Sequence, residues 1–243
     1  MFFCLLQYDC REPIFLLKTT NASVNFIPCL HLAVPTFAGM IIQPMLPAHV
    51  RDLAALQELV FPTLAAADRI RAEQYLRHLE VFPEGQFVLV AEGELIGSTT
   101  TMRTTFNFDK PRHRFRDTFG GGWLTHHRPG GDWLYGLDLS IHPAWRGRGG
   151  ARLLYRARHL LARHLGLRGQ LTVGMPSGYG ALGDQLSGED YYEQWLAGLR
   201  ADPALTPQQK IGFRPLALIP DYLDDPVCGN FGVLLRLDID LEV

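Results

Sequence analysis

The residues of this sequence best placed for chemistry form one short turn, residues 142–152, with the sequence His-Pro-Ala-Trp-Arg-Gly-Arg-Gly-Gly-Ala-Arg. An apolar run, Leu134 to Ile141, precedes the turn and predicts a strand, and leucines at helical spacing follow it and predict a helix. A helix that begins after a glycine turn presents unpaired N–H groups and the positive end of its dipole. Glycine also lets the backbone approach an anion where a Cβ would collide. The turn is therefore predicted to bind a phosphate group.

Two common nucleotide motifs do not fit this turn. It lacks the P-loop pattern G-x-x-x-x-G-K followed by Ser or Thr, and the dinucleotide pattern G-x-G-x-x-G would need a glycine where the chain has Arg152. What remains is R-x-x-G-x-A at Arg146, Gly149 and Ala151, directly after a predicted strand. This pattern resembles the acyl-CoA motif of the GNAT superfamily of N-acyltransferases. The alternative is a glycine-rich turn of purely structural use.

The resemblance implies that acetyl-CoA is a co-substrate and that the turn holds its pyrophosphate. The backbone groups of Leu139 and Ile141 match the family positions that contact the thioester and pantetheine. The expected CoA-binding residues are Leu139, Ile141, Arg146, Gly147, Arg148, Gly149, Gly150, Ala151 and Arg152. Two arginines further along the helix, Arg158 and Arg163, are interpreted as part of a solvated helix face.

Over nearly all of residues 40–243, the sequence also resembles one subgroup of the superfamily. That subgroup is the GNAT domain found fused to carbon–nitrogen hydrolases. The hydrolase half is absent from this sequence, so amidase chemistry is not expected. The segments that carry this likeness are residues 125–138, 153–158, 176–179 and 221–225.

The implied reaction is direct attack of a neutral amine on an acyl thioester, which requires a base to take a proton from the ammonium. Asp138 is the predicted base because it is the only carboxylate in the motif strand. Strand alternation places it on the same face as Ser140 and on the opposite face from Leu137, Leu139 and Ile141. A structural hydrogen-bond acceptor is the alternative role for Asp138, and His126 is the alternative base. Tyr135 and His126 are expected to contact the substrate.

The departing thiolate is helped by a proton donor, and here the sequence differs from the family. The family pattern places a tyrosine four residues before a Gly-Phe pair, but the residue four before Gly212 and Phe213 in that pattern is Gln208. Tyr179 is the predicted substitute, and Tyr222 is the next candidate. A buried tyrosine bonded to backbone is the preferred interpretation of Tyr222. A thiolate with a pKa near ~8.5 can also leave unaided.

The composition excludes several classes of protein. The chain has 243 residues, 47% of them hydrophobic and 20% charged, with a net charge of −2, which is typical of a globular protein without a nucleic-acid or membrane partner. The four cysteines (Cys4, Cys10, Cys29 and Cys228) form no C-x-x-C motif and no metal-ligand spacing. Neither a metal nor a disulfide framework is expected, Cys228 is interpreted as a core or turn residue, and the cytoplasm is the expected location.

The order of the predicted elements is that of a GNAT domain over residues 40–243, preceded by a non-domain segment, residues 1–39. The predicted fold is α/β (α+β), with a mixed, mostly antiparallel sheet flanked by helices and splayed at the two strands around the acyl-CoA site. Insertions at about 104–132 and 176–210 lie where this fold builds its acceptor pocket. Strands are predicted at 87–91, 95–103, 134–141, 170–174, 213–219 and 232–239, and helices at about 50–60, 66–79 and 189–199, the last capped by Ser187.

The sequence therefore predicts an acyl-CoA-dependent N-acyltransferase. Acetyl-CoA is the expected donor, and the acceptor is a primary amine on a small molecule or a peptide. The alternative is a non-catalytic acyl-CoA-binding or sensing module, which the missing tyrosine at position 208 favours. A homodimer is left open as the oligomeric state.

Overall fold

The structure is a computed structural model, and it describes residues 39–183 and 185–239. The expectation for residues 1–39 concerns a segment that lies, apart from Gly39, outside the described residues, as do Cys4, Cys10 and Cys29. Within the described part, seven strands form one open sheet in the order β1-β2-β3-β4-β5-β7-β6. Neighbouring strands are antiparallel except β4 and β5, which are parallel. The strands are β1 (Met40–Pro44), β2 (Gln86–Ala91), β3 (Glu94–Thr104), β4 (Trp133–Ile141), β5 (Gly169–Gly174), β6 (Arg214–Ile219) and β7 (Gly232–Asp238).

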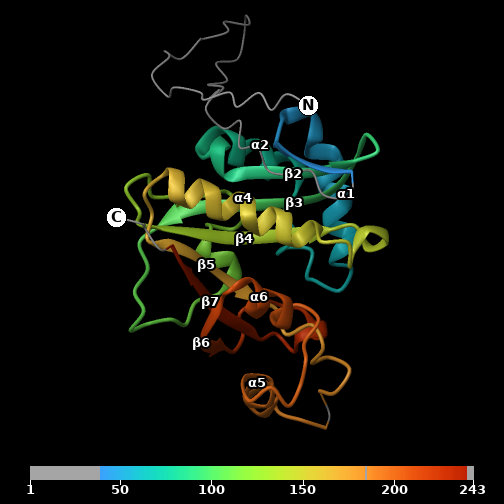
Figure 1. The fold of residues 1–243 in the computed structure, drawn as a ribbon, viewed down its shortest axis with the longest axis vertical. Helices are drawn as coiled ribbons and strands as arrows, with labels where there is room; N and C mark the ends of the chain where they lie inside the picture. The colour runs from blue at the N-terminus through green and yellow to red at the C-terminus, as the bar shows by residue number, and fades with distance from the viewer. Residues whose placement is uncertain (1–38, 184, 240–243) are drawn as a thin grey trace, which may run out of the picture. The chain divides into compact units, whose positions relative to one another are not determined.

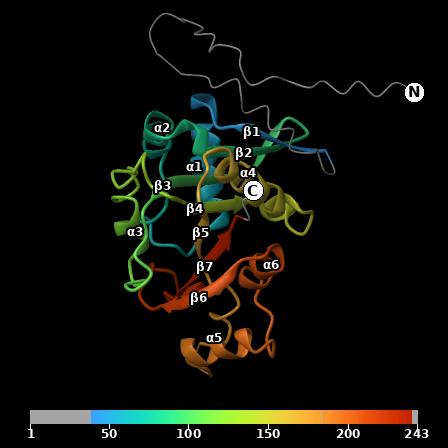
Figure 2. The same ribbon diagram turned by 60° about the vertical axis from the view of Figure 1, so that its left-hand side comes forward.

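Helices cover both faces of this sheet, as Figures 1 and 2 show. Helix α4 (Gly150–His164) crosses one face and turns its leucines toward the strands, and α6 (Leu205–Ile211) lies on the same side. Helices α1 (Val50–Val60) and α2 (Ala72–Val81) lie on the opposite side with the short α3 (Phe115–Thr118). The remaining helix is α5 (Gly188–Leu196). The predicted mixed, mostly antiparallel sheet flanked by helices is confirmed.

Two of the helix predictions need correction. The second helix begins at Ala72 rather than near residue 66, because Arg69 folds back and donates to the carbonyls of Leu64 and Pro62 in a turn. In α1, Leu59 continues the helical spacing of Leu53 and Leu56 and would share their apolar face, but it is 49% exposed. Gln57 is buried in its place, since its side chain reaches a polar partner under the helix.

The second insertion contains one helix that was predicted and one that was not. Helix α5 begins where expected, and Ser187 caps it by accepting a hydrogen bond from the Asp190 N–H at 3.0 Å. Helix α6 was missed because its seven residues are too short and too polar to show a helical period.

The first insertion, residues 104–132, is packed against α2 rather than projecting freely. Gly120, Gly121 and Gly122 all have positive φ. This turn brings two carbonyls to α2, where Gln74 donates to the Gly121 oxygen at 2.8 Å and His78 Nε2 lies 2.7 Å from the Gly122 oxygen. The insertion therefore has a fixed position over the face of the sheet that α1 and α2 cover.

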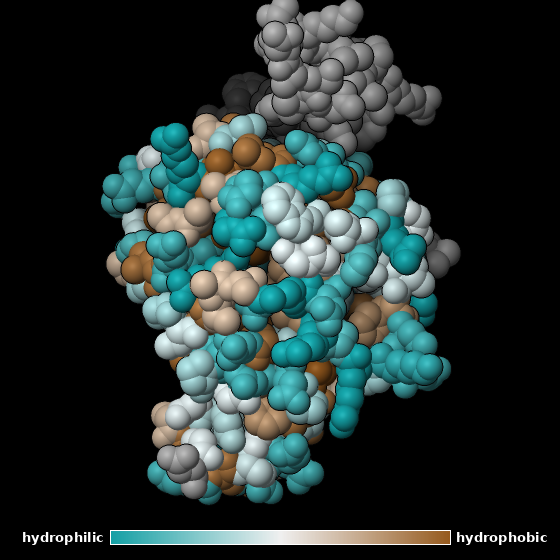
Figure 3. All heavy atoms as spheres, turned by 180° about the vertical axis from the view of Figure 1, so that it is seen from behind, coloured by the Kyte–Doolittle hydropathy of each residue, from teal (hydrophilic) through white to brown (hydrophobic). Residues whose placement is uncertain are grey.

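The molecular surface has no broad apolar area on the face that Figure 3 shows, where apolar residues are scattered among hydrophilic ones. None of the described helices has the length and apolar character needed to cross a membrane.

Candidate active site

The glycine turn between β4 and α4 has the backbone geometry of an anion site. Gly147 and Gly149 have φ of +75° and +88°, which glycine adopts without strain. Gly150 begins α4 so close to the sheet that a Cβ there would come within 2.8 Å of Leu89. Within the described part of the chain, no hydrogen bond uses the backbone N–H groups of residues 147–152, and the Leu153 N–H is the first to bond, to the Gly149 oxygen. These free N–H groups are the donors that a pyrophosphate requires.

Three arginines surround these free N–H groups. The Arg146 side chain is held by a hydrogen bond from its Nε to the Ile141 carbonyl at 3.3 Å. The Arg148 guanidinium lies 4.7 Å from the centre of the Trp145 ring, and Arg152 is exposed in the first turn of α4. Guanidinium groups bind phosphate oxygens through charge-assisted hydrogen bonds, so the turn combines two kinds of phosphate donor.

Strand β4 loses its β5 neighbour halfway along its length. The parallel pairing runs only from Trp133 to Gly136, although β4 continues to Ile141. On the other side, pairing with β3 continues to the end of β4, where the His142 N–H donates to the Ile96 oxygen. Backbone groups alternate in direction along a strand, so those of Leu139 and Ile141 point away from β3 into the gap. These residues have the geometry expected of pantetheine-binding positions, and that role stays a prediction.

A β-bulge puts Leu137 on the same face of the sheet as Asp138. Thr100 pairs with Asp138 while Thr101 pairs with Gly136, so Leu137 is an extra residue in β4. The expectation that Asp138 and Leu137 lie on opposite faces is therefore wrong, whereas the expectation that Asp138 shares a face with Ser140, away from Leu139 and Ile141, is confirmed. Leu137 packs in the core on the α1 and α2 side, and the Asp138 carboxylate accepts from Ser140 Oγ at 3.2 Å on that same side.

The Asp138 carboxylate lies in a small polar cluster within an apolar surround. Ser140 Oγ also accepts from Gln57 of α1, at 3.1 Å. Burial raises the pKa of Asp138 to about 6, although Gln57, the Arg158 cation and Ser140 each lower it. With a pKa near 6 the carboxylate is ionised in about nine-tenths of molecules at pH 7 and can still take a proton, which suits a general base.

Arg158 is fully buried, and the prediction that it belongs to a solvated helix face is wrong. Its exposed fraction is 1%, its Nε donates to Thr99 Oγ1 at 2.6 Å, and its Nη2 donates to the Asp138 carbonyl. The guanidinium fits because Gly136 has no side chain, since a Cβ there would come within 2.1 Å of Nη1. The sequence signal was present, because Arg158 lies four residues after Leu154 on the apolar side of the helix. Arg163 is exposed, as expected.

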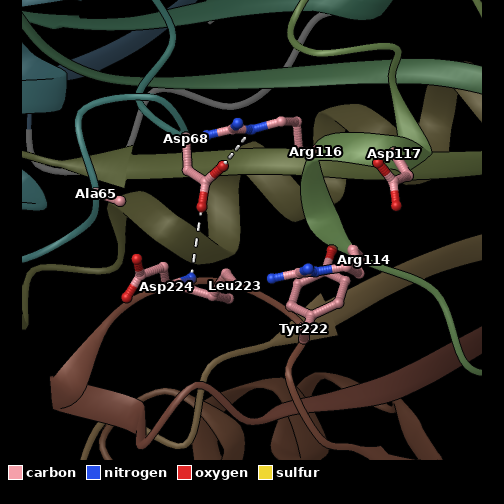
Figure 4. Close-up of a pocket in the computed structure, with 8 residues that line it drawn as sticks. All are labelled: Ala65, Asp68, Arg114, Arg116, Asp117, Tyr222, Leu223 and Asp224. Carbon is pink, nitrogen blue, oxygen red and sulfur yellow. Dashed lines mark hydrogen bonds and ion pairs between the residues drawn. The ribbon is translucent and has the colours of Figure 1, made fainter.

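A cavity of about 340 Å³ opens on the side of the sheet that carries α1 and α2 (Figure 4). The Asp68 carboxylate bridges two segments that line the cavity. It accepts hydrogen bonds from Arg116 Nε at 3.0 Å and from the Asp224 N–H at 3.4 Å. His126, a predicted substrate residue, is exposed, and its Nδ1 lies 2.8 Å from the Asp117 carbonyl at the cavity rim. The lining residues are Ala65, Asp68, Arg114, Arg116, Asp117, Tyr222, Leu223 and Asp224.

A chain of hydrogen bonds leads from this cavity to Tyr135, the other predicted substrate residue. Tyr222, which lines the cavity, has its Oη 3.4 Å from that of Tyr135, and His113 Nε2 is 2.7 Å from the Tyr135 Oη. His113 Nδ1 faces the Pro111 carbonyl at 2.6 Å and must carry the hydrogen, so Nε2 accepts from Tyr135. Tyr222 then donates to Tyr135, and its expected bond to backbone is replaced by this tyrosine pair.

The predicted acid Tyr179 and the residue at the family's tyrosine position, Gln208, have different surroundings. Tyr179 packs edge to face against Tyr191 and Phe231, with ring centres 5.6 Å apart in both pairs. Gln208, at the position where the family has tyrosine, donates from Nε2 to the Tyr155 Oη at 2.7 Å. Sequence reasoning singled out Tyr179 and did not consider Tyr155, whose contact with Gln208 joins residues far apart in the chain.

Cys228 has the core position that was expected. It is completely buried, and burial raises the pKa of its thiol to about 12, so it is no nucleophile at neutral pH. In residues 39–183 and 185–239, no three His, Cys, Asp or Glu side chains form a group that could hold a metal ion.

Comparison with curated proteins gives two similar sequences from Bacillus subtilis (strain 168), while no family model matches the chain. One is named Probable hydrolase YhcX and is 33% identical over 198 residues, which are 81% of this chain but only 38% of that protein. The other is named Uncharacterized N-acetyltransferase YkwB and is 28% identical over 201 residues, which cover 82% of this chain and 89% of that protein. This chain matches only part of Probable hydrolase YhcX, which agrees with the predicted resemblance to a GNAT domain that is fused to a hydrolase. That narrower resemblance stays a prediction.

The fold is that of several solved structures. The GphF GNAT-like decarboxylase in complex with isobutyryl-CoA has a TM-score of 0.68 at 24% identity, covering 82% of this chain and 98% of that one. The loading GNATL domain of CurA from Lyngbya majuscula gives the same TM-score and identity, covering 82% and 97%. The chain therefore has the GNAT fold. The structure of yncA from Salmonella typhimurium with its cofactor acetyl-CoA has a TM-score of 0.51 at 16% identity, covering 84% of this chain and 96% of that one.

The described residues fit the acyl-CoA that the GNAT fold implies. The free N–H groups of residues 147–152 suit its pyrophosphate, and the unpaired edge of β4 suits the amide groups of its pantetheine. Four polar residues near this candidate site were not identified from the sequence, and they come from distant segments: Gln57, His113, Tyr155 and Arg158. Of these, only Arg158 left a signal in the sequence.

Proposed function

We propose that the protein is an acyl-CoA-dependent N-acyltransferase that transfers an acetyl group from acetyl-CoA to a primary amine. The observation that carries the proposal is the free edge of β4 between Gly136 and the glycine turn. That edge offers backbone donors and acceptors in line with the free N–H groups of residues 147–152, so a thioester bound along it has its carbonyl beside preorganised donors.

The proposed base in this mechanism is Asp138. The backbone of Asp138 belongs to the acyl-CoA strand, while its carboxylate lies on the side of the sheet where the cavity opens. An ammonium that arrives from that side loses its proton to Asp138, directly or through a water molecule. The neutral amine then attacks the thioester carbon, and the thiol of CoA departs.

The cavity supplies an acceptor site with carboxylates that favour a cationic amine. Asp68 already pairs with Arg116, but the described residues provide no ion pair for Asp117 or Asp224, so these two carboxylates can attract an ammonium group. The floor of the cavity is Tyr222, which connects through its hydrogen bond to Tyr135 of β4. The route from the cavity to the thioester therefore passes the tyrosine pair.

The test is release of free thiol from acetyl-CoA in the presence of a panel of primary amines, with mass spectrometry of the products. The proposal expects thiol release that depends on particular amines and yields their acetyl derivatives. Tight CoA binding by calorimetry with no thiol release from any acyl-CoA would instead support the non-catalytic binding module. Asp224→Asn is expected to raise KM for the preferred amine several-fold and to leave KM for acetyl-CoA unchanged, with exposed Glu58→Gln as the control.

A second candidate is decarboxylation of a carboxyacyl-CoA, and Arg158 is the observation that favours it. No carboxylate of the described residues hydrogen-bonds to this buried cation, and one of the similar structures is a GNAT-like decarboxylase. A carboxylate beside Arg158 would be held by a charge-assisted bond until carbon dioxide leaves. Malonyl-CoA belongs in the panel for this reason, and its conversion to acetyl-CoA without an amine would favour this candidate.

A further inference from the structure

Gln208 occupies the sequence position where the family pattern has a tyrosine. Its side chain, however, hydrogen-bonds to a different tyrosine, Tyr155. Gln208 is 8% exposed, and its Nε2 donates to the Tyr155 Oη at 2.7 Å. Its Oε1 has no hydrogen-bond partner in the described part of the chain and faces Gly174, where a Cβ would come within 2.4 Å of it. Gly174 ends β5, the strand that separates from β4. The pair of Gln208 and Tyr155 therefore lies against the gap between the two strands.

The surroundings of Tyr155 prepare it to lose its proton to a group in that gap. The residue is 6% exposed and packs in one apolar cluster with Leu139, whose backbone faces the gap, and with Phe213. Because its Oη accepts from Gln208, the hydroxyl proton is free, and no acceptor among residues 39–183 and 185–239 takes it. The Arg158 guanidinium lies 5.2 Å from the centre of its ring.

The charge state of Tyr155 also suits a donor. Burial raises the pKa of Tyr155, so the hydroxyl is neutral at pH 7 and carries the proton to be given. The Arg158 cation acts in the other direction and stabilises the tyrosinate that remains after the proton has left.

We propose that Tyr155 is the proton donor to the departing thiolate of CoA and that Gln208 is its positioning residue. This inference rests on the proposed acyl transfer. The amine nitrogen forms a bond to the thioester carbon, the carbon–sulfur bond breaks, and its electron pair goes to sulfur. The Tyr155 hydroxyl gives its proton to that sulfur and so yields the CoA thiol. The proton that the amine nitrogen loses when the amide forms returns to the tyrosinate, so the charges balance.

The first test compares leaving groups. Loss of a general acid costs about 100-fold in turnover when the leaving group needs the proton. Tyr155→Phe is therefore expected to lower kcat/KM about 100-fold with acetyl-CoA but less than about 3-fold with an acetyl thioester of 4-nitrothiophenol, whose thiolate leaves unaided. Tyr192→Phe, in the same apolar cluster, is the matched control and should change neither value. An equal loss with both thioesters, or no loss with either, would overturn the proposal.

The second test places the family tyrosine back in α6. In the Tyr155→Phe background, Gln208→Tyr is expected to recover at least about 10-fold of kcat/KM with acetyl-CoA, since it returns a phenol to the same gap. Gln208→Leu is expected to lower turnover with acetyl-CoA more than with the aryl thioester, because it removes only the bond that orients Tyr155. Absence of both effects would assign the pair a purely structural role.

A binding measurement separates failure of this inference from failure of the proposed function. By calorimetry, wild-type protein is expected to bind CoA at least 5-fold more tightly than desulfo-CoA because Tyr155 contacts the sulfur, a preference that Tyr155→Phe removes. If no amine is acetylated but this preference is present and lost in the variant, acyl transfer is wrong and the placement of Tyr155 is right. If amines are acetylated but the preference is absent, Tyr155 is not at the sulfur.

Discussion

Replacing Asp138 by asparagine should stabilise the protein at neutral pH while it removes the base. Burial raises the pKa of this carboxyl from 3.8 to about 6, so the folded state holds the proton more tightly than the unfolded state does. The group's contribution to stability is fully present below about pH 4 and is lost as the pH rises through 6. The difference of about two pKa units corresponds to about 3 kcal/mol at pH 7.5.

The variant Asp138→Asn keeps the shape of the protonated acid and never ionises. We expect it to be up to about 3 kcal/mol more stable than wild type at pH 7.5 but only up to about 1 kcal/mol more stable at pH 4.5, measured by urea unfolding followed by circular dichroism. Glu58→Gln, at an exposed carboxylate of α1, serves as the control and should show no pH-dependent gain. A variant that is less stable at pH 7.5, or that gains equally at both pH values, would refute the argument from burial.

The same variant tests the catalytic role. Wild-type kcat with acetyl-CoA and the preferred amine should rise with pH through about 6, as Asp138 ionises. Asp138→Asn should be much slower at neutral pH, without that acidic limb and with little change in acetyl-CoA affinity. An unaltered pH–rate profile would make Asp138 a structural hydrogen-bond acceptor, which was the alternative role.

Three further variants probe the acyl-CoA strand and its turn. Gly149→Glu should lower CoA affinity at least about 100-fold by calorimetry with an unchanged circular dichroism spectrum, because it adds bulk and negative charge among free N–H groups; unchanged affinity would refute the pyrophosphate assignment. Arg158→Met should raise the pKa of Asp138 and move the acidic limb of the kcat profile to higher pH, and an unmoved limb would show that the two groups are not coupled. Gly136→Ala should destabilise the fold by about 1–3 kcal/mol in urea, because its Cβ meets the Arg158 guanidinium, whereas Gly130→Ala, with open space around its Cβ, should not; equal effects would contradict the packing.

The strand, turn and helix at residues 134–164 could be predicted because every signal for them is local. The apolar run, the glycines and the leucine spacing each describe a short segment without reference to the rest of the chain. The direction of the Leu139 and Ile141 backbone groups also followed, since it depends only on the alternation between the end of β4 and its β3 partner. The residues predicted to bind the cofactor thus lie within about thirty consecutive residues, as is usual for local motifs.

The face occupied by Leu137 could not be predicted, because a bulge is a property of two strands. Whether Leu137 is accommodated as an extra residue depends on how β3 pairs on both sides of it, and no feature of β4 alone determines that. The contacts of Gln57, His113 and Gln208 escaped prediction for the same reason, since each joins a strand or helix to a segment more than twenty residues away.

Asp138 and Arg158 divide the site between the two faces of the sheet. The Asp138 carboxylate shares a face with Ser140, whereas Arg158 belongs to α4 on the other face. The guanidinium binds the Asp138 carbonyl through the sheet, and the carboxylate faces Ser140 and the cavity side. The cation is then close enough to lower the pKa of Asp138 but is not paired with it, so the carboxylate remains available to a proton. A buried charge without a carboxylate partner is costly, and its retention here is explained if the reaction needs both groups ionised on opposite sides of the acyl-CoA strand.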